Sequence, residues 1–125
     1  MKTNSTYNLV IVVPCYNEQD RLPVSQFKTF AKSNPETLIC FVNDGSKDNT
    51  EAVLSKLEEE HPNTITQLSL AKNAGKSGAV RQGFLHCIEK FNFNKIAYLD
   101  ADLATSLEEC VRVSESVKDD IVFSF

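Results

Sequence analysis

Residues 9–13 read Leu9-Val10-Ile11-Val12-Val13, and this unbroken aliphatic run decides the fold class. Such runs are typical of strands in a parallel sheet, because helices cover both faces of that sheet. Pro14 follows directly, and its missing backbone N–H predicts that the strand ends there. The run therefore predicts a strand buried on both faces.

Strands and helices alternate along the rest of the chain. Apolar runs predict further strands at 38–42, 64–70, 95–99 and 121–123, with amphipathic helices between them, the last at 107–117. The clearest helix is marked by residues at helical spacing, namely Val80, Phe84, Cys87, Ile88 and Phe91. This order predicts one α/β domain over residues 1–125, with three α/β/α layers and a mostly parallel sheet.

Composition excludes several classes of protein. The chain has 125 residues, 42% of them hydrophobic, and a net charge of −4, so it has no basic excess for binding nucleic acid. Its four cysteines form no C-x-x-C pair, which argues against a zinc knuckle or a dense disulfide framework. The five-residue apolar run is too short for a signal peptide or a membrane span. We therefore expect a soluble, cytoplasmic chain.

Polar residues follow each of the first four predicted strands. They are Tyr16-Asn17-Glu18, Asp44, the segment 73–78, and Asp100 with Asp102. The carboxyl ends of parallel strands meet at one edge of a sheet, which is where α/β proteins bind ligands. The sequence therefore predicts a binding crevice at that edge.

The triplet Asp100-Ala101-Asp102 suggests a divalent cation site. In extended backbone, residues i and i+2 lie on the same side, about 6.5–7 Å apart, so both carboxylates would face one ligand. A bound Mg²⁺ or Mn²⁺ would relieve their repulsion and leave positions open for phosphate oxygens. The alternative is a solvated pair beside a helix start at Thr105 or Ser106.

Asp44 and Tyr16 each allow two interpretations. Asp44 precedes Gly45 at a strand end, where its carboxylate would accept from a ribose hydroxyl or a base N–H, or would instead cap a turn or helix. Tyr16 would stack on a base, or would be a partly buried aromatic at a strand end. Glu18 is either a ligand contact or a solvated charge.

The glycine-containing segment 73–78 is not a P-loop, because Leu70 stands where the first glycine would be. It also lacks the first glycine of a dinucleotide fingerprint, although Gly75, Gly78 and Asp100 imitate the rest. A NAD-binding Rossmann domain thus stays open, as does a non-catalytic receiver-like module of similar size. Lys76 at a predicted helix start would suit a diphosphate.

Taken together, these segments resemble the N-terminal half of family 2 glycosyltransferases. The resemblance is carried by residues 12–18, 42–50, 73–79 and 100–102, and within the family it is nearest to the dolichyl-phosphate β-glucosyltransferases, with the mannosyltransferases as close relatives. It implies a GT-A, Rossmann-like fold and an inverting, metal-dependent transferase of glycan or cell-envelope biosynthesis. The donor would be a UDP- or GDP-sugar, and a UDP-glucose-like donor is the expectation.

The resemblance also implies residue roles. Pro14, Tyr16 and Glu18 would line the nucleotide pocket, Asp44 would contact the base or ribose, and Gly75 with Lys76 would border the diphosphate. Asp102 would ligate Mg²⁺ or Mn²⁺, and Asp100 would support the ribose or the metal.

The acceptor half of the family is expected beyond Phe125, together with any catalytic base, so we expect a truncated enzyme that binds donor and lacks turnover. The acceptor would be polyprenyl phosphate or a glycan. The full-length protein would be peripheral to the inner face of a membrane. An unpaired edge at the last strand would favour self-association.

Overall fold

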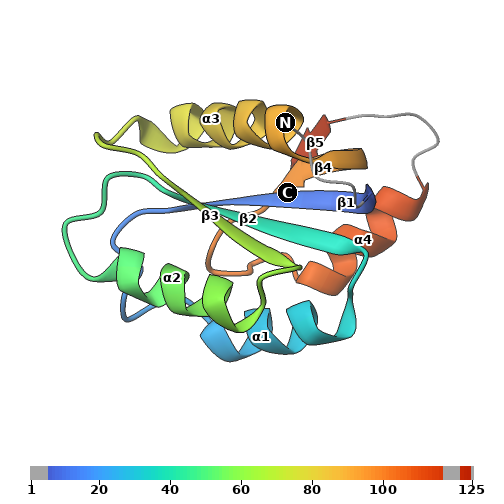
Figure 1. The fold of residues 1–125 in the computed structure, drawn as a ribbon, viewed down its shortest axis with the longest axis horizontal. Coiled ribbons are helices and arrows are strands. Elements are labelled where there is room, and N and C mark those ends of the chain that lie inside the picture. Colours follow the sequence, from blue (N-terminus) through green and yellow to red (C-terminus); the bar gives the residue numbers. More distant parts are fainter. Residues whose placement is uncertain (1–5, 117–121, 125) are drawn as a thin grey trace.

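The computed structural model describes residues 6–116 and 122–124, which form one sheet with helices on both of its faces (Figure 1). The elements follow in the order β1 (Thr6–Cys15), α1 (Val24–Ser33), β2 (Thr37–Asn43), α2 (Thr50–Glu60), β3 (Ile65–Ser69), α3 (Gly75–Lys90), β4 (Asn92–Tyr98), α4 (Leu107–Ser116) and β5 (Val122–Ser124). The strand order is β3-β2-β1-β4-β5 and every pairing is parallel. The predicted α/β fold is confirmed. Residues 117 and 121, placed at ends of the predicted elements, lie outside the described residues.

β1 is the central strand, paired with β2 on one side and β4 on the other. Leu9, Ile11 and Val13 pack against the layer of α1, α2 and α4. Val10 and Val12 point to the opposite face and pack against α3. Because successive side chains alternate between two covered faces, the strand needs apolar residues at every position, as its sequence has.

The strand does not end before Pro14, as the sequence predicted, but continues to Cys15. Pro14 pairs with Val42 of β2, whereas the β1–β4 pairing stops at Val12. The carbonyl of Val12 points to β4 and that of Cys15 to β2, so the nitrogen of Pro14 faces the β4 side, beyond the last pair. Proline costs the sheet no hydrogen bond there, because no partner strand remains.

α3 buries small residues against the sheet. Its buried stripe is Ala79, Val80, Gly83 and Cys87, whereas Ile88, predicted from helical spacing to be in the core, is 51% exposed. A Cβ on Gly83 would lie 2.6 Å from Val12 Cγ1 and 2.8 Å from Val42 Cγ2. The helix therefore sits closer to the strands than a larger residue would allow.

The order β3-β2-β1-β4-β5 creates a topological switch between β1 and β4. From β1 the chain turns to β2 on one side, and from β3 it crosses the sheet to β4 on the other. Ligands of open α/β sheets bind at such a point, beyond the strand C-termini. This order also differs from the 2-1-3-4-5 order of receiver domains, which argues against that alternative.

β5 lies at one edge of the sheet, next to β4. Self-association through this edge stays a prediction. Among the residues that the structure describes, no helix is both long and apolar enough to cross a membrane.

Candidate functional site

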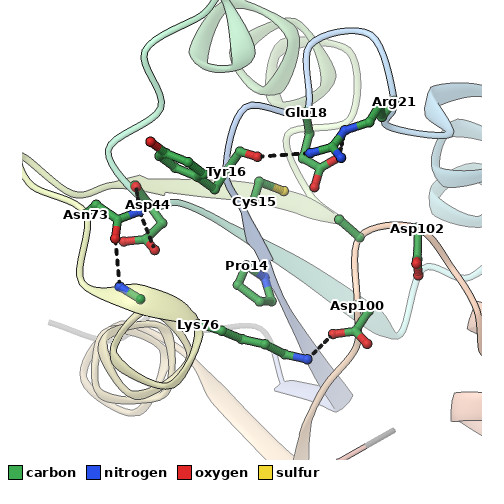
Figure 2. Close-up of a pocket in the computed structure, with 12 residues that line it drawn as sticks. Pro14, Cys15, Tyr16, Glu18, Arg21, Asp44, Asn73, Lys76, Asp100 and Asp102 are labelled. Carbon is green, nitrogen blue, oxygen red and sulfur yellow. Dashed lines mark hydrogen bonds and ion pairs between the residues drawn. The ribbon is translucent and has the colours of Figure 1, made fainter.

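A pocket of about 430 Å³ opens at the C-terminal edge of the sheet, at the switch between β1 and β4 (Figure 2). Its lining comes from the C-terminal ends of β1, β2 and β4, from the loops that follow them, and from the start of α3. The lining residues are Pro14, Cys15, Tyr16, Glu18, Arg21, Asp44, Asn73, Gly75, Lys76, Asp100, Ala101 and Asp102. All eight residues proposed from the sequence are among them. Cys15, Arg21, Asn73 and Ala101 were not proposed, although each is one to three residues from a proposed one.

The pocket has two distinct sides. Figure 2 shows Tyr16, Asp44 and Asn73 on one side and Asp100 with Asp102 on the other, while Lys76 reaches toward Asp100. An aromatic ring, a buried carboxylate and an exposed amide therefore face a pair of more exposed carboxylates. Such a pocket can hold an elongated ligand with a flat, polar end and a charged end.

Asp44 is only 3% exposed, and both of its carboxylate oxygens accept hydrogen bonds from the chain. Oδ1 accepts from the Ala74 N–H at 2.6 Å and Oδ2 from Asn73 Nδ2 at 3.2 Å. Asn73 Nδ2 also donates to the Asp44 carbonyl at 3.1 Å. Asp44 thus lines the pocket and also anchors the segment before α3, while its contact with a ribose or a base stays a prediction.

Gly45 allows the turn after β2 to lie against the segment before α3. Its φ of +67° is the left-handed conformation that favours glycine, as expected for this turn. A Cβ at this position would lie 2.6 Å from the Asn73 nitrogen and 2.9 Å from the Lys72 carbonyl carbon. A side chain at residue 45 would therefore push the segment before α3 away from Asp44.

Lys76 and Asp100 form an ion pair, with 2.5 Å between Nζ and Oδ1. The ammonium also lies 5.8 Å from the centre of the Tyr98 ring. The hydrogen bond to Asp100 is the main cause that raises the pKa of Lys76 above its ordinary value, and the nearby charges of Asp100, Tyr98 and Asp102 act in the same direction. Lys76 is therefore a protonated cation at neutral pH.

Asp100, Ala101 and Asp102 do not lie in extended backbone, contrary to the sequence-based expectation. β4 ends at Tyr98, and the Leu103 N–H donates to the Asp100 carbonyl at 3.1 Å, which closes a turn. The Asp102 Oδ1 accepts from the Ala104 N–H at 3.0 Å. Both carboxylates still line one pocket, but the turn brings them there instead of the alternation of a strand.

One part of the alternative, a helix start at Thr105 or Ser106, agrees with the structure. Ser106 precedes α4, and its Oγ accepts from the Glu109 N–H at 3.0 Å, so Ser106 is the helix cap. Asp100 and Asp102 are not needed for that capping. Neither carboxylate is used up in capping α4, and both line the pocket.

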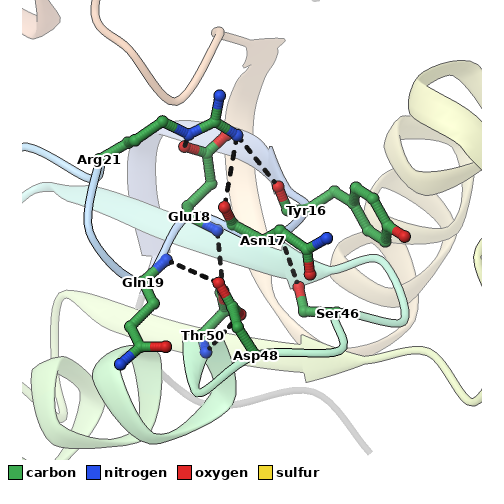
Figure 3. A network of polar contacts seen from close by, with 8 residues as sticks. All are labelled: Tyr16, Asn17, Glu18, Gln19, Arg21, Ser46, Asp48 and Thr50. Carbon is green, nitrogen blue, oxygen red and sulfur yellow. Dashed lines mark hydrogen bonds and ion pairs between the residues drawn. The ribbon is translucent and has the colours of Figure 1, made fainter.

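A network of hydrogen bonds holds the loop after β1 against the start of α2 (Figure 3). Three consecutive N–H groups of that loop donate to side chains of the other segment: Asn17 to Ser46 Oγ at 3.0 Å, Glu18 to Thr50 Oγ1 at 2.8 Å, and Gln19 to Asp48 Oδ2 at 3.3 Å. The positive φ of 53° at Asn17 is fixed in this way. The network therefore sets the positions of Tyr16 and Glu18 before any ligand arrives.

Arg21 belongs to the same loop and lies over its turn. Its Nε is 3.4 Å from Glu18 Oε1, and one of its terminal nitrogens donates to the Asn17 carbonyl at 3.3 Å. The Arg21 side chain is 69% exposed. The Arg21–Glu18 pair thus borders the pocket at a position that the solvent reaches.

Cys15 contributes a buried thiol to the pocket wall. Burial is the larger cause that raises its pKa, and the Glu18 carboxylate raises it further. A thiol with a raised pKa is not a thiolate at neutral pH, so Cys15 is not an activated nucleophile.

The pocket is acidic. Among the residues that the structure describes, its lining has the carboxylates of Glu18, Asp44, Asp100 and Asp102 against the cations of Arg21 and Lys76. Four negative charges against two positive ones give the lining a net charge of −2. An anionic ligand would enter this pocket more favourably together with a cation.

The donor set fits a divalent cation that is shared with a ligand. Within residues 6–116 and 122–124, no group of three or more His, Cys, Asp or Glu side chains could hold a metal ion alone. Asp100 and Asp102 supply two carboxylates at the pocket. Mg²⁺ is commonly bound by one or two carboxylates plus substrate phosphates, so these residues suit such a cation best when phosphate oxygens complete its coordination.

Comparisons with known proteins agree with this architecture. Residues 10–122 match the family model described as Glycosyl transferase family 2. A dolichyl-phosphate beta-glucosyltransferase of Trichomonas vaginalis is 37% identical over 115 residues, which are 86% of this chain and 33% of the relative. The human dolichyl-phosphate beta-glucosyltransferase is 34% identical over 123 residues, which are 91% of this chain and 37% of the relative.

A bacterial relative and a solved structure extend this picture. An undecaprenyl-phosphate 4-deoxy-4-formamido-L-arabinose transferase of Pseudomonas fluorescens is 33% identical over 118 residues, covering 92% of this chain and 33% of the relative. The structure of a mannosyltransferase from Pyrobaculum calidifontis in complex with GDP-Man and Mn²⁺ matches with a TM-score of 0.59 at 20% sequence identity. The match covers 79% of this chain and 28% of the mannosyltransferase chain. This likeness shows the fold. The chain spans about a third of the length of these curated relatives. The family and the relatives named above are glycosyltransferases, which does not favour the NAD-binding or receiver alternatives.

Proposed function

This chain belongs to glycosyl transferase family 2, and from that premise we propose that it is the donor-binding part of a metal-dependent sugar transferase. Residues 1–125 would form the GT-A domain that binds a nucleotide-diphospho-sugar. The protein as a whole would transfer a hexose, with inversion, to polyprenyl phosphate. Relatives named for dolichyl-phosphate and undecaprenyl-phosphate support this acceptor class over a glycan.

The observation that carries the proposal is the two-sided pocket at the topological switch. Its dimensions and polarity suit a nucleoside diphosphate, with the base and ribose toward Tyr16 and Asp44 and the diphosphate toward Gly75 and Lys76. Tyr16 is 38% exposed, and its ring would be available for stacking. Pro14 and Glu18 would complete the wall on the nucleoside side.

Asp100 and Asp102 would hold Mg²⁺ or Mn²⁺ together with oxygens of the diphosphate. The cation's charge would offset the negative charge that develops on the nucleoside diphosphate as the sugar–phosphate bond breaks. The net charge of −2 on the lining supports this assignment, because a diphosphate alone would add further negative charge to an acidic pocket. Lys76 would donate to the same diphosphate and orient it.

The acceptor attacks the sugar from the face opposite the leaving diphosphate in an inverting transfer. A lipid phosphate is already anionic and needs no strong general base, whereas a hydroxyl acceptor does. We propose that the acceptor binds to a part of the protein beyond Phe125 and that any catalytic base also lies there. A lipid acceptor would place the full-length protein at the cytoplasmic face of a membrane.

Ligand binding to the 125-residue chain tests the proposal. UDP, GDP, UDP-glucose and GDP-mannose are titrated by calorimetry with and without Mn²⁺, and NADH serves as the ligand of the NAD-binding alternative. We expect one nucleoside diphosphate to bind with Mn²⁺ and to stabilise the fold by about 2.7 kcal/mol at about a hundred times its Kd. The UDP and GDP arms decide between a UDP-glucose-like and a GDP-mannose-like donor.

Asp102→Asn separates the metal site from the nucleoside site. It should remove the Mn²⁺-dependent part of binding and leave the urea midpoint unchanged, because Asp102 is exposed and accepts one local hydrogen bond. Asp20→Asn, an exposed charge on the loop after β1, is the matched control. Binding of NADH but of neither nucleoside diphosphate would overturn the proposal.

A further inference from the structure

Lys76 is tied to one of the two carboxylates that are candidates for the cation. Its Nζ lies 2.5 Å from Asp100 Oδ1, and the side chains are 56% and 41% exposed, respectively. Figure 2 shows the lysine reaching across from α3 to the turn after β4, so the pair joins two segments that line the pocket. A single flexible ammonium and a divalent cation thus have the same carboxylate within reach.

We propose that Lys76 is an internal counter-ion that competes with a divalent cation for Asp100, so that a free cation binds weakly until an anionic ligand draws the ammonium away. This inference rests on the proposed function and adds a regulatory role to a residue that the proposal places at the diphosphate. Its consequence is cooperative binding of the nucleoside diphosphate and the cation.

The reasoning is electrostatic. An ammonium held against Asp100 repels a dication that approaches the same oxygen, and it also satisfies the charge that would attract the dication. A diphosphate offers several anionic oxygens to Lys76, and charge-assisted hydrogen bonds to phosphate are as favourable as those to a carboxylate. Moving the ammonium from Asp100 to the diphosphate exposes the carboxylate at the moment when phosphate oxygens become available as ligands.

The position of Lys76 makes this exchange feasible. It is the second residue of α3, so its backbone is held by the helix while its four-carbon side chain can rotate. Both partners of the pair are solvent-exposed, and exposed ion pairs contribute little to stability. A cation or a diphosphate can therefore break the pair at low cost.

The first experiment uses Mn²⁺ alone. Binding of Mn²⁺ to the wild-type chain and to Lys76→Met is measured from the EPR signal of the free ion, with circular dichroism to verify the fold. We expect the variant to bind Mn²⁺ about three- to tenfold more tightly, the range set by removing one exposed positive charge beside the carboxylate. Lys72→Met, which removes the same charge from the exposed loop before α3, should leave the affinity unchanged.

A double-mutant cycle tests whether the effect passes through Asp100. In the background of Asp100→Asn, Lys76→Met should change the Mn²⁺ affinity by less than about twofold, because the shared carboxylate is gone. An affinity of Lys76→Met equal to or below that of the wild type would overturn the proposal. So would an undiminished effect in the Asp100→Asn background, or no measurable Mn²⁺ binding by either protein at millimolar concentration.

The nucleotide arm separates this inference from the proposed function. Mn²⁺ should tighten UDP or GDP binding by a larger factor in the wild type than in Lys76→Met, and by linkage the nucleotide should tighten Mn²⁺ by the same factor. An equal factor in both proteins would contradict the exchange. If neither nucleotide binds while Lys76→Met still tightens Mn²⁺, the proposed function fails and the competition for Asp100 stands.

Discussion

Replacing Asp44 by asparagine should weaken both the fold and the pocket, because this side chain joins β2 to the start of α3. Its Oδ1 accepts from the Ala74 N–H and its Oδ2 from Asn73 Nδ2. The introduced asparagine would keep one acceptor for Ala74, but its amide nitrogen would then face the amide nitrogen of Asn73 across the 3.2 Å that now separates Asp44 Oδ2 from that nitrogen. Two donors at that distance repel each other.

Rotation of the Asn73 amide does not rescue the variant. The rotated amide would present its oxygen to residue 44, but its Nδ2 would lose the Asp44 carbonyl, and its Oδ1 would lose the Gly75 N–H that it accepts at 3.2 Å. At least one hydrogen bond is lost in either arrangement, and the charge on the remaining one is removed. A net loss of about 1–2 kcal/mol follows from the usual value of such bonds.

Urea unfolding measures this loss directly. For a domain of this size a slope of about 2 kcal/mol per molar urea is ordinary, so the midpoint of Asp44→Asn should fall by about 0.5–1 M. Asp20→Asn, which removes an exposed charge, should leave the midpoint unchanged. An unchanged midpoint for Asp44→Asn would refute the claim that this carboxylate anchors the segment before α3. Weaker nucleotide binding by the variant, even without Mn²⁺, is expected in addition.

Two further predictions concern α3 and the loop network. Gly83→Ala should lower the free energy of unfolding by about 1–2 kcal/mol. The added Cβ would lie 2.6 Å from Val12 and 2.8 Å from Val42, and the cost of this overpacking exceeds the gain of about 1 kcal/mol in helix propensity. A urea midpoint at or above that of the wild type would contradict this. The hydrogen bond from the Thr50 hydroxyl lowers the pKa of Asp48 below its ordinary value of 3.8. The stability that this carboxylate contributes is therefore complete above the ordinary pKa, which applies to the unfolded chain, and is lost as pH falls through the lower pKa of the folded state. Asp48→Asn should therefore show a smaller drop in urea midpoint between about pH 5 and pH 3, and equal drops in both proteins would count against the network.

The fold could be predicted because its signals are local. The continuous run Leu9–Val13 identifies a strand covered on both faces, and each later helix and strand appears within a few residues of its predicted place. The misses have physical causes that the pattern does not contain. Pro14 is tolerated because the neighbouring strand has ended, and the burial of α3 depends on how closely Gly83 approaches Val12, which is a property of the packed pair of elements.

The position of the pocket could also be predicted, since it follows from topology. Parallel strands bring their carboxyl ends together, so residues 16, 44, 76, 100 and 102, separated by up to 86 positions, were expected at one edge and lie around one pocket. The turn at Asp100 and the ion pair with Lys76 could not be predicted. A D-x-D triplet is compatible with a strand or a turn, and the partner of a lysine at a helix start depends on how the turn after β4 closes.

The three acidic residues Asp44, Asp100 and Asp102 illustrate why residue type alone does not determine a role. Asp44 is 3% exposed and both its oxygens are already held by N–H groups of the chain, so its position is set before a ligand arrives, which suits recognition of a nucleoside. Asp100 is held by one mobile ammonium and can change partner, which suits a cation that comes and goes with a diphosphate. Asp102 has one oxygen bound to the adjacent Ala104 N–H and remains exposed. A carboxylate whose oxygens are bound by fixed donors of the chain is a rigid acceptor, whereas one bound by a lysine side chain is exchangeable. On this basis the nucleoside side of the pocket should bind in the absence of metal, and only the diphosphate side should depend on it.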